Sequence, residues 1–406
     1  MNNNHWIESN PFFNLNDFEE IYKTAISTET PTFLYSKKVI DKQYFLLREN
    51  LPEQIKIFYA QKSNPNKEIL ETIHGHGAGC DTASIGEMAK ALDAGFPKDK
   101  IMLTGPAKTQ RELKFALQRN IYSINVESLQ ELELVNWLAE EGNYNQDILL
   151  RVNPPFDAGE ENTIIGGMGV SKFGIDVDYV PEFIERVLNM KNLSLKGIHI
   201  FNSSQILNWE RIYDNTVDVI DTAMEISKTF DLEFKRLDMG GGFGIPYSKN
   251  EKEVNISALG SKLDELLKSP EYGDFLSGME LIYEPGRYLS GMSGIYITKV
   301  LYTKVSNGRK IALVDGGIHH MIRPILIGQP HPIINLSAIY NGRNNMDKYL
   351  VAGPLCTSLD RFDTEAMLND VKTGDILAVL NAGAYGYTES MPLFLSHKPA
   401  SEIFIN

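Results

Sequence analysis

The sequence predicts an α/β protein: a (β/α)8 barrel of the TIM type followed by a C-terminal all-β domain. Short apolar, β-branched runs alternate with helix-like stretches, and there are about eight such units. After residue 294 the pattern changes to strand-like segments without helices between them. Alternation indicates a parallel sheet, and eight units favour a closed barrel. An open, doubly wound sheet would alternate in the same way, so the count alone leaves that alternative open.

The predicted barrel strands share an apolar core and a turn-like end. They are the runs 57–62, 79–84, 101–106, 122–128, 148–154, 195–201, 236–242 and 280–287. The stretches between them have helical spacing of apolar residues, as 127–141 does with its leucines and Val135. We therefore place the barrel at 31–293 and the β-domain at 294–406, and expect the segment 1–30 to pack with the β-domain.

Composition narrows the class of protein. The 406 residues are 43% hydrophobic and 23% charged, which is typical of a globular chain. A net charge of -14 argues against a nucleic-acid partner, because that polyanion requires a basic face. Neither a signal peptide nor a membrane span is recognisable, and two cysteines, Cys80 and Cys356, cannot form a disulfide framework. We expect a cytoplasmic protein without a membrane partner.

Polar residues gather where the predicted barrel strands end, which is where barrels of this type carry out chemistry. They are Lys62, Asp81, Ser84, Arg151, Asn153, His199, Gly240, Gly241, Gly242, Glu284 and Arg287. Taken singly, a lysine after a strand is usually a solvated surface residue, and a glycine run is usually a tight turn.

The combination of these residues matches the needs of pyridoxal phosphate (PLP). A lysine can form an imine with it, and an acid can keep its pyridine nitrogen protonated, so that the ring accepts electrons. Consecutive glycines with a nearby arginine can bind its phosphate. The glycine run lacks the lysine and serine of a nucleotide P-loop, and no metal site is predicted.

The chain resembles the fold type III PLP-dependent decarboxylases, the family of ornithine, arginine and diaminopimelate decarboxylases. The resemblance extends from about residue 30 to the C-terminus. Its motifs are YAQKSNPNKEIL, GAGCDTASIGEM, RVNP, SKFGI, LDMGGGFGIPY, EPGRYL, VDGGIHHMIRP, GPLCTSLD and NAGAYG. The resemblance implies an alanine racemase-like barrel, a β-domain and a head-to-tail homodimer with shared active sites.

The resemblance also assigns roles to individual residues. It implies that Lys62 carries PLP as a Schiff base, that Glu284 holds the pyridine nitrogen and that Cys356, reaching in from the partner subunit, assists protonation of the carbanion. The residues implied to contact the phosphate are Ser204, Gly240, Gly241, Gly242 and Arg287. Asp81 near the lysine and Tyr385 are further implied cofactor contacts.

Several positions depart from the family pattern. Phe201 stands where the family usually has a histidine against the pyridine ring, so it can stack but cannot offer an imidazole proton. Thr357 replaces the acid that binds a substrate's distal amine. Arg323 matches an arginine used on a distal carboxylate, although Ile327 replaces the tyrosine that accompanies it. We therefore expect a substrate with an anionic or bulky distal end, with Asp360 serving the substrate or the interface.

The combination FNSSQ, VDGGIHH and GPLCT resembles family members from natural-product biosynthesis. Some of these act on amino acids joined to a carrier protein or another conjugate, so the expected substrate is a small molecule or a carrier- or conjugate-linked amino acid. The roles of His199, His319 and His320 stay open. The alternatives are a PLP-dependent racemase and a non-catalytic protein that kept the fold.

Overall fold

The computed structural model describes residues 4–153 and 171–405 of the chain. It contains two compact units that are interleaved along the sequence. The barrel unit comprises Tyr44–Gly244 and Val254–Gly286, and the β-unit comprises Met1–Gln43, Ile245–Glu253 and Arg287–Asn406. The domain boundaries drawn from the sequence stay predictions. Among the described residues, no helix has the length and apolar character that crossing a membrane requires.

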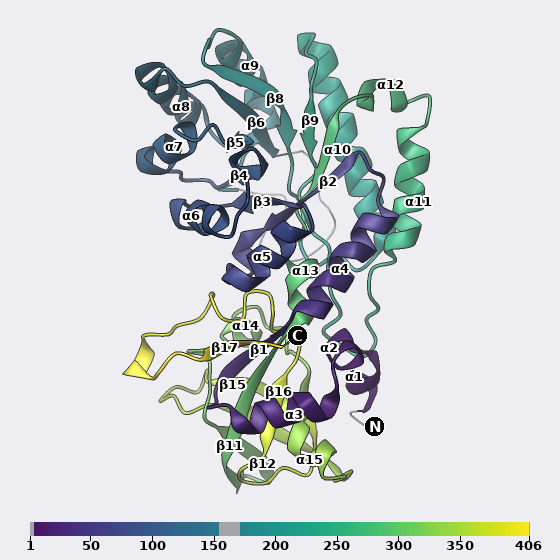
Figure 1. Cartoon of the computed structure of the whole chain (residues 1–406), viewed down its shortest axis with the longest axis vertical. Coiled ribbons are helices and arrows are strands. Elements are labelled where there is room, and N and C mark those ends of the chain that lie inside the picture. Colours follow the sequence, from purple (N-terminus) through teal and green to yellow (C-terminus); the bar gives the residue numbers. More distant parts are fainter. Residues whose placement is uncertain (1–3, 154–170, 406) are drawn as a thin grey trace. The chain divides into compact units, whose positions relative to one another are not determined.

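Eight parallel strands close into a barrel in the order β5-β4-β3-β2-β10-β9-β8-β6, with β5 pairing β6 to complete the ring (Figure 1). They are β2 (Ile55–Ala60), β3 (Gly79–Thr82), β4 (Ile101–Leu103), β5 (Ser123–Val126), β6 (Gln146–Asn153), β8 (Leu193–His199), β9 (Arg236–Asp238) and β10 (Glu280–Tyr283). A short strand, β7 (Ile175–Asp176), pairs with β6 outside this ring. The closed ring confirms the predicted fold class and excludes the open sheet.

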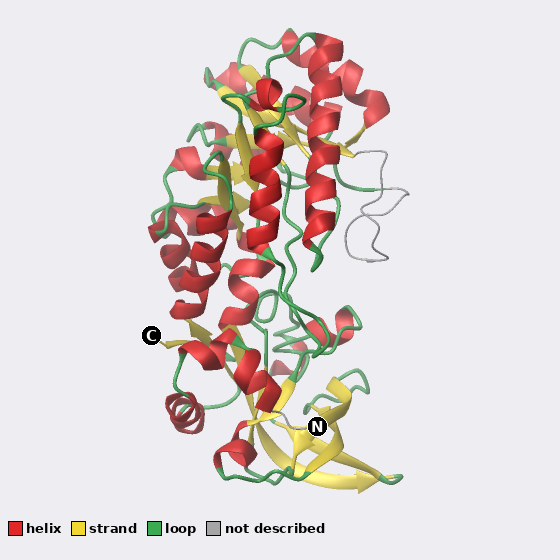
Figure 2. Cartoon of the chain, turned by 90° about the vertical axis from the view of Figure 1, so that its right-hand side faces the viewer, coloured by secondary structure: helices red, strands yellow, loops and turns green. Residues whose placement is uncertain are grey.

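The helices of the barrel unit follow the strands in sequence and lie outside them (Figure 2). They are α5 (Lys67–Gly75), α6 (Ile85–Asp93), α7 (Gln110–Leu117), α8 (Leu129–Gly142), α9 (Val180–Leu188), α10 (Trp209–Phe230), α11 (Ile256–Leu267) and α12 (Gly273–Leu276), with 3-10 turns η1 (Gln61–Ser63), η2 (Lys98–Lys100) and η3 (Val177–Tyr179). Helix α4 (Lys37–Asn50) begins in the β-unit and ends in the barrel unit.

Polar side chains at the strand-to-helix junctions start these helices. Asn66, Ser84, Thr109, Ser128 and Asn208 each accept a hydrogen bond from a backbone N–H of the following first turn. Because the helices cover the barrel, β4 and β5 are buried along their whole length. Each junction at the carboxyl end of a strand is therefore fixed by the buried strand before it and by the capped helix after it.

The β-unit is a mostly antiparallel sheet of order β13-β16-β11-β12-β14-β15, to which β1 adds through β11 and β17 through β1. Its strands are β1 (Thr32–Ser36), β11 (Gly294–Ser306), β12 (Arg309–Val314), β13 (Ile333–Asn335), β14 (Met346–Ala352), β15 (Arg361–Asn369), β16 (Ile376–Val379) and β17 (Ser401–Ile405). Short helices interrupt it: α1 (Asn4–Ser9), α2 (Pro11–Leu15), α3 (Phe18–Ser27), α13 (Arg287–Ser290), α14 (Arg323–Leu326) and α15 (Leu336–Tyr340), with 3-10 turns η4 (Gly291–Ser293) and η5 (Phe394–Ser396).

The N-terminal helices share a hydrophobic core with this sheet. Trp6, Phe12 and Ile21 pack in one cluster with Leu34 of β1 and Ile295 of β11. Burying large apolar side chains contributes about 1.5–3 kcal/mol each, so this cluster anchors the N-terminal segment to the sheet.

Candidate active site

Lys62 lies at the carboxyl end of the barrel, in the 3-10 turn that follows β2. Its Nζ is 3.4 Å from Oδ2 of Asp81, which is buried on the neighbouring strand β3. The same Nζ lies 5.6 Å from the ring centroid of Phe201, which follows β8. The structure thus brings together three of the residues singled out from the sequence: an amine, an acid and an aromatic ring.

The glycine run Gly240–Gly242 forms a tight turn after β9. Gly240 and Gly242 have φ angles of +65° and +98°, in the region that favours glycine. A Cβ on Gly241 would lie 2.5 Å from the carbonyl oxygen of Glu284, and one on Gly242 would lie 2.9 Å from that of Ser203. Side chains are therefore sterically excluded here, and the backbone N–H of Gly240 donates to Asp238 Oδ1 at 3.0 Å.

Ser204 belongs to the segment that lies against this turn. The neighbouring Ile206 donates its backbone N–H to the carbonyl oxygen of Gly242 at 2.8 Å. An isolated parallel bridge links Ile206 to Phe243 in the same place. The half-buried Ser204 is thus in the loop that faces the glycine turn.

Two buried carboxylates and a buried imidazole meet inside the barrel. Asp238 ends β9, Glu284 follows β10 and His199 ends β8, and one polar atom from each lies within 4.8 Å of the others. Burial, together with the neighbouring Asp238 and Asp81, raises the pKa of Glu284 well above its ordinary value. Burial likewise raises the pKa of Asp238 to about 7. The two acids therefore share protons as a coupled pair.

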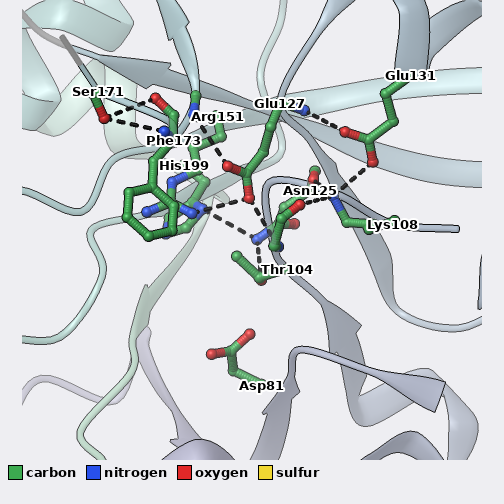
Figure 3. A network of polar contacts seen from close by, with 12 residues as sticks. Asp81, Thr104, Lys108, Asn125, Glu127, Glu131, Arg151, Ser171, Phe173 and His199 are labelled. Carbon is green, nitrogen blue, oxygen red and sulfur yellow. Dashed lines mark hydrogen bonds and ion pairs between the residues drawn. The ribbon is translucent and has the colours of Figure 1, made fainter. Parts of the chain in front are cut away.

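A network of polar side chains extends from this cluster across β4, β5 and β6 (Figure 3). Asn125 Nδ2 contacts His199 Nδ1 at 3.3 Å and donates to Thr104 Oγ1 at 3.0 Å. Arg151 donates to Glu127 at 2.9 Å, and both of these side chains are buried. A buried charge pair of this kind is held by additional hydrogen bonds, here from the N–H groups of Gly105 and Gly174 to Glu127.

Within the β-unit, Arg287 and Tyr385 lie together. The guanidinium carbon of Arg287 is 5.0 Å from the ring centroid of Tyr385, and its Nη1 donates to Tyr247 Oη at 3.1 Å. Arg323 lies 4.5 Å from the same ring. Its Nη1 donates to Glu389 Oε2 at 2.8 Å, and the arginine side chain is buried. Tyr385 thus lies beside two arginines, of which Arg323 has its charge balanced by Glu389.

The loop that follows β14 carries Cys356, whose side chain is exposed, and the half-buried Thr357. Asp360 closes this loop: its carboxylate accepts hydrogen bonds from the N–H groups of Ile318 at 2.8 Å and Leu355 at 2.7 Å. A Cβ on Gly353 would lie 2.4 Å from that carboxylate, so the loop is folded tightly over it. Asp360 therefore fixes the backbone of the loop that carries Cys356.

Sequence reasoning missed several polar residues of these sites. Asp238 ends a barrel strand, and the same position at a strand end identified Asp81 from the sequence. Asp238 was overlooked because the adjacent glycine run is the more conspicuous functional feature of that strand end. Asn125, within the last two residues of β5, and Glu127, directly after the strand, carry the same signal of a polar residue at a strand end. Glu389 lies in a loop with no periodic pattern, so no local signal marked it.

Comparison with known proteins identifies the relatives of this chain. Residues 37–291 match the family described as pyridoxal-dependent decarboxylase, pyridoxal binding domain. An L-glutamyl-[BtrI acyl-carrier protein] decarboxylase of Niallia circulans is 31% identical over 392 residues, covering 95% of this chain and 91% of the relative. A diaminopimelate decarboxylase of Aquifex aeolicus is 33% identical over 389 residues, covering 94% and 90%.

The solved structures agree. The crystal structure of diaminopimelate decarboxylase from Helicobacter pylori, complexed with L-lysine, superimposes with a TM-score of 0.86 at 28% identity, covering 96% of this chain and 94% of that one. A lysine decarboxylase from Selenomonas ruminantium has a TM-score of 0.81 and covers 95% of each chain, but at 23% identity it supports the fold alone.

Proposed function

The chain belongs to the pyridoxal-dependent decarboxylases, and from this premise we propose that its substrate is an amino acid carried on a larger conjugate. That the chain is a PLP-dependent amino-acid decarboxylase follows from its family and relatives. The finer proposal concerns which residues perform the reaction and which part of the substrate is recognised.

The residues of the barrel unit fit the cofactor. Oδ1 of the buried Asp81 makes no hydrogen bond with the described residues, and Oδ2 of Asp238 and Oε1 of Glu284 have no partner there besides the contact between these two acids themselves. Buried acceptors without partners are costly, by about 1–3 kcal/mol each, so such a group of them indicates a ligand with donors. When bound, pyridoxal phosphate supplies a protonated pyridine ring that accepts the electrons left behind by CO2. Its ring N–H is such a donor.

The proposed roles follow from these positions. Lys62, beside Asp81, would hold the cofactor, Glu284 would accept the pyridine N–H, and Phe201 would contact the ring. We propose that N–H groups of the glycine turn and Ser204 would bind the phosphate; the role of Arg287, a residue of the β-unit, stays an implication of the family resemblance. Helical and loop N–H groups with a guanidinium are the usual ligands of a phosphate. We propose Tyr385, which contacts Arg287, as a further cofactor contact.

Proton return to the substrate is assigned to Cys356. The thiol is exposed on a loop that Asp360 holds in place. We propose that it reaches the active site of a partner subunit in a homodimer and delivers a proton to the α-carbon. A positioned proton donor of this kind commonly supplies about 10²–10⁴-fold in rate.

The observation that carries the substrate proposal is the ion pair between Arg323 and Glu389. Arg323 is the residue matched to an arginine that binds a distal carboxylate, yet its guanidinium is already held by an acid of the same chain. Thr357 gives no carboxylate for a distal amine. A free amino acid with a distal carboxylate would therefore find no available guanidinium, and one with a distal amine would find no carboxylate. A neutral distal group joined to a carrier would need no such ionic partner. The relative named for a glutamyl group on an acyl carrier protein supports this class of substrate.

Two measurements test the proposal. Decarboxylation of free glutamate, ornithine and diaminopimelate is compared with that of the same amino acids linked to a carrier protein or a pantetheine thioester, with CO2 and product mass as readouts. We expect turnover of a linked substrate at least about tenfold above that of free ones, since one charged interaction contributes about 1.5–3 kcal/mol. Preference for a free substrate would overturn the substrate class.

The second measurement concerns Lys62. Borohydride reduction of the cofactor-loaded enzyme, followed by peptide mapping, is expected to label this lysine. Lys62→Ala is expected to abolish both the label and CO2 release, while Lys67→Ala, an exposed lysine of α5, leaves both unchanged. A label on another lysine would reject the proposed active site.

A further inference from the structure

His199 is a buried histidine whose role the family pattern leaves open. It is the last residue of β8, and its side chain is 1% exposed. Phe201 lies two residues later, beyond the end of the strand, and is only half-buried. The His199 ring is thus more deeply buried than the Phe201 ring, and it lies near the acids Asp238 and Glu284.

The surroundings of His199 define which ring nitrogen carries the proton. Asn125 Oδ1 accepts a hydrogen bond from Ser123 Oγ at 2.8 Å, which turns Nδ2 of Asn125 towards Thr104 and His199 (Figure 3). Nδ2 then donates to Nδ1 of His199 at 3.3 Å. An imidazole that accepts at Nδ1 carries its proton at Nε2 when it is neutral.

The other side of the ring points to the acid pair. His199 Nε2 is 3.7 Å from Glu284 Oε2 and makes no hydrogen bond with the described residues. Contacts of this kind are often long without the ligand and tighten when it binds. The charged side chains around the ring are the cations Lys62, Lys108 and Arg151 and the acids Asp238 and Glu284. Burial, followed by these three cations, holds the pKa of His199 well below its ordinary value.

We propose that His199 is a positioning residue for the cofactor: Asn125 locks it as the Nε2–H tautomer, and this N–H donates to Glu284. The donated bond stabilises the anionic form of Glu284, which can then hold a cationic ring nitrogen although Asp238 is next to it. The inference rests on the proposed function, because it assigns Glu284 to the pyridine nitrogen.

Three variants and one control separate this role from simple packing. His199→Leu removes the donor, Asn125→Leu removes the group that fixes the tautomer, and His199→Gln keeps an N–H near the position of Nε2. His74→Gln alters a histidine of α5 outside the barrel interior and is the control. The readout is the dissociation constant of pyridoxal phosphate, measured by titration of the cofactor-free protein, with circular dichroism and melting temperature as checks of folding.

We expect His199→Leu and Asn125→Leu to raise the dissociation constant by about tenfold to a hundredfold, the range for a hydrogen bond to a charged group. His199→Gln is expected to stay within about threefold of the wild type, and His74→Gln to match it. A wild-type dissociation constant in folded His199→Leu would overturn the inference. So would an equal loss in His199→Gln and His199→Leu.

A measurement on the unaltered protein covers the case in which these variants do not fold. In histidine-selective ¹⁵N spectra of the cofactor-loaded enzyme at neutral pH, His199 is expected to show the Nε2–H tautomer. A proton on Nδ1, or on both nitrogens, would overturn the inference. Borohydride labelling of Lys62 keeps the two proposals apart: if the label is present and the tautomer is wrong, only the role of His199 falls.

Discussion

At the scale of single residues, the clearest physical consequence comes from the protonation of the adjacent buried acids Asp238 and Glu284. Two carboxylates buried side by side cannot both be ionised without a compensating cation. In the cofactor-free protein they retain protons that exposed acids would have lost. The family resemblance pointed to Glu284 alone, but the structure makes its neighbour part of the same titrating unit.

This coupling predicts how stability depends on pH. Asp238 has a pKa of about 7 in the folded protein, against about 3.9 for an aspartate in an unfolded chain. Between these values the unfolded chain binds fewer protons than the folded one, so the free energy of unfolding falls as pH rises from about 4 to about 7. Asp238→Asn is expected to flatten this fall by at least about 1 kcal/mol in urea unfolding of the cofactor-free protein.

The control for this experiment is Asp93→Asn, which alters an acid with a 71% exposed side chain. It is expected to follow the wild-type profile. Parallel profiles for wild type and Asp238→Asn would show that Asp238 does not retain its proton in the folded state.

A second prediction at this scale concerns Glu389. Glu389→Ala frees the guanidinium of Arg323, whose Nη1 now donates to that acid at 2.8 Å. If Arg323 faces the substrate's distal end, the variant is expected to raise kcat/KM for free diaminopimelate by about tenfold, the value of one charged hydrogen bond. Glu402→Ala, which removes an acid bonded to Tyr35 instead, is the control. If kcat/KM for free diaminopimelate does not rise in Glu389→Ala, Arg323 does not take part in substrate recognition.

At the scale of elements, the glycine turn after β9 is where backbone geometry decides function. Gly241→Ala would place a Cβ 2.5 Å from the carbonyl oxygen of Glu284, so either the turn or the segment after β10 must shift. We expect a destabilisation of about 1–3 kcal/mol, as for an overpacked core, and at least a tenfold loss of cofactor affinity. Gly75→Ala in α5, where a Cβ meets nothing within 4 Å, is the matched control.

Thermal unfolding and cofactor titration of these two glycine variants measure both effects. Unchanged affinity in folded Gly241→Ala would mean that the turn does not bind the phosphate.

The elements were also the part of the structure that sequence could predict best. All eight barrel strands overlap the predicted runs, because a covered parallel strand is a short apolar segment with a polar end. The short helices α14 and α15 of the β-unit were not predicted, since four or five residues carry no helical period. The pair Arg323–Glu389 joins residues 66 apart in the sequence, and no local pattern specifies such a contact.

At the scale of the whole molecule, the proposal requires two copies of the chain, since Lys62 and Cys356 are assigned to one active site from different subunits. The exposed thiol of Cys356 is accompanied by the exposed side chain of Leu359 on the same loop. A shared active site requires the partner subunit to cover this loop.

Mixing two inactive variants tests the shared site directly. A Lys62→Ala subunit contributes no lysine to the active site in its own barrel, and a Cys356→Ala subunit contributes no thiol to the active site of its partner. In a C2 dimer with shared sites, a hybrid of the two variants has one site with both defects and one with neither. Random exchange of equal amounts makes about half of the dimers hybrids, so about a quarter of wild-type activity is expected to return on mixing. If the lysine and the thiol acted within one subunit, each hybrid would contain only singly defective sites and no activity would return; sedimentation analysis of the mixture establishes that dimers are present.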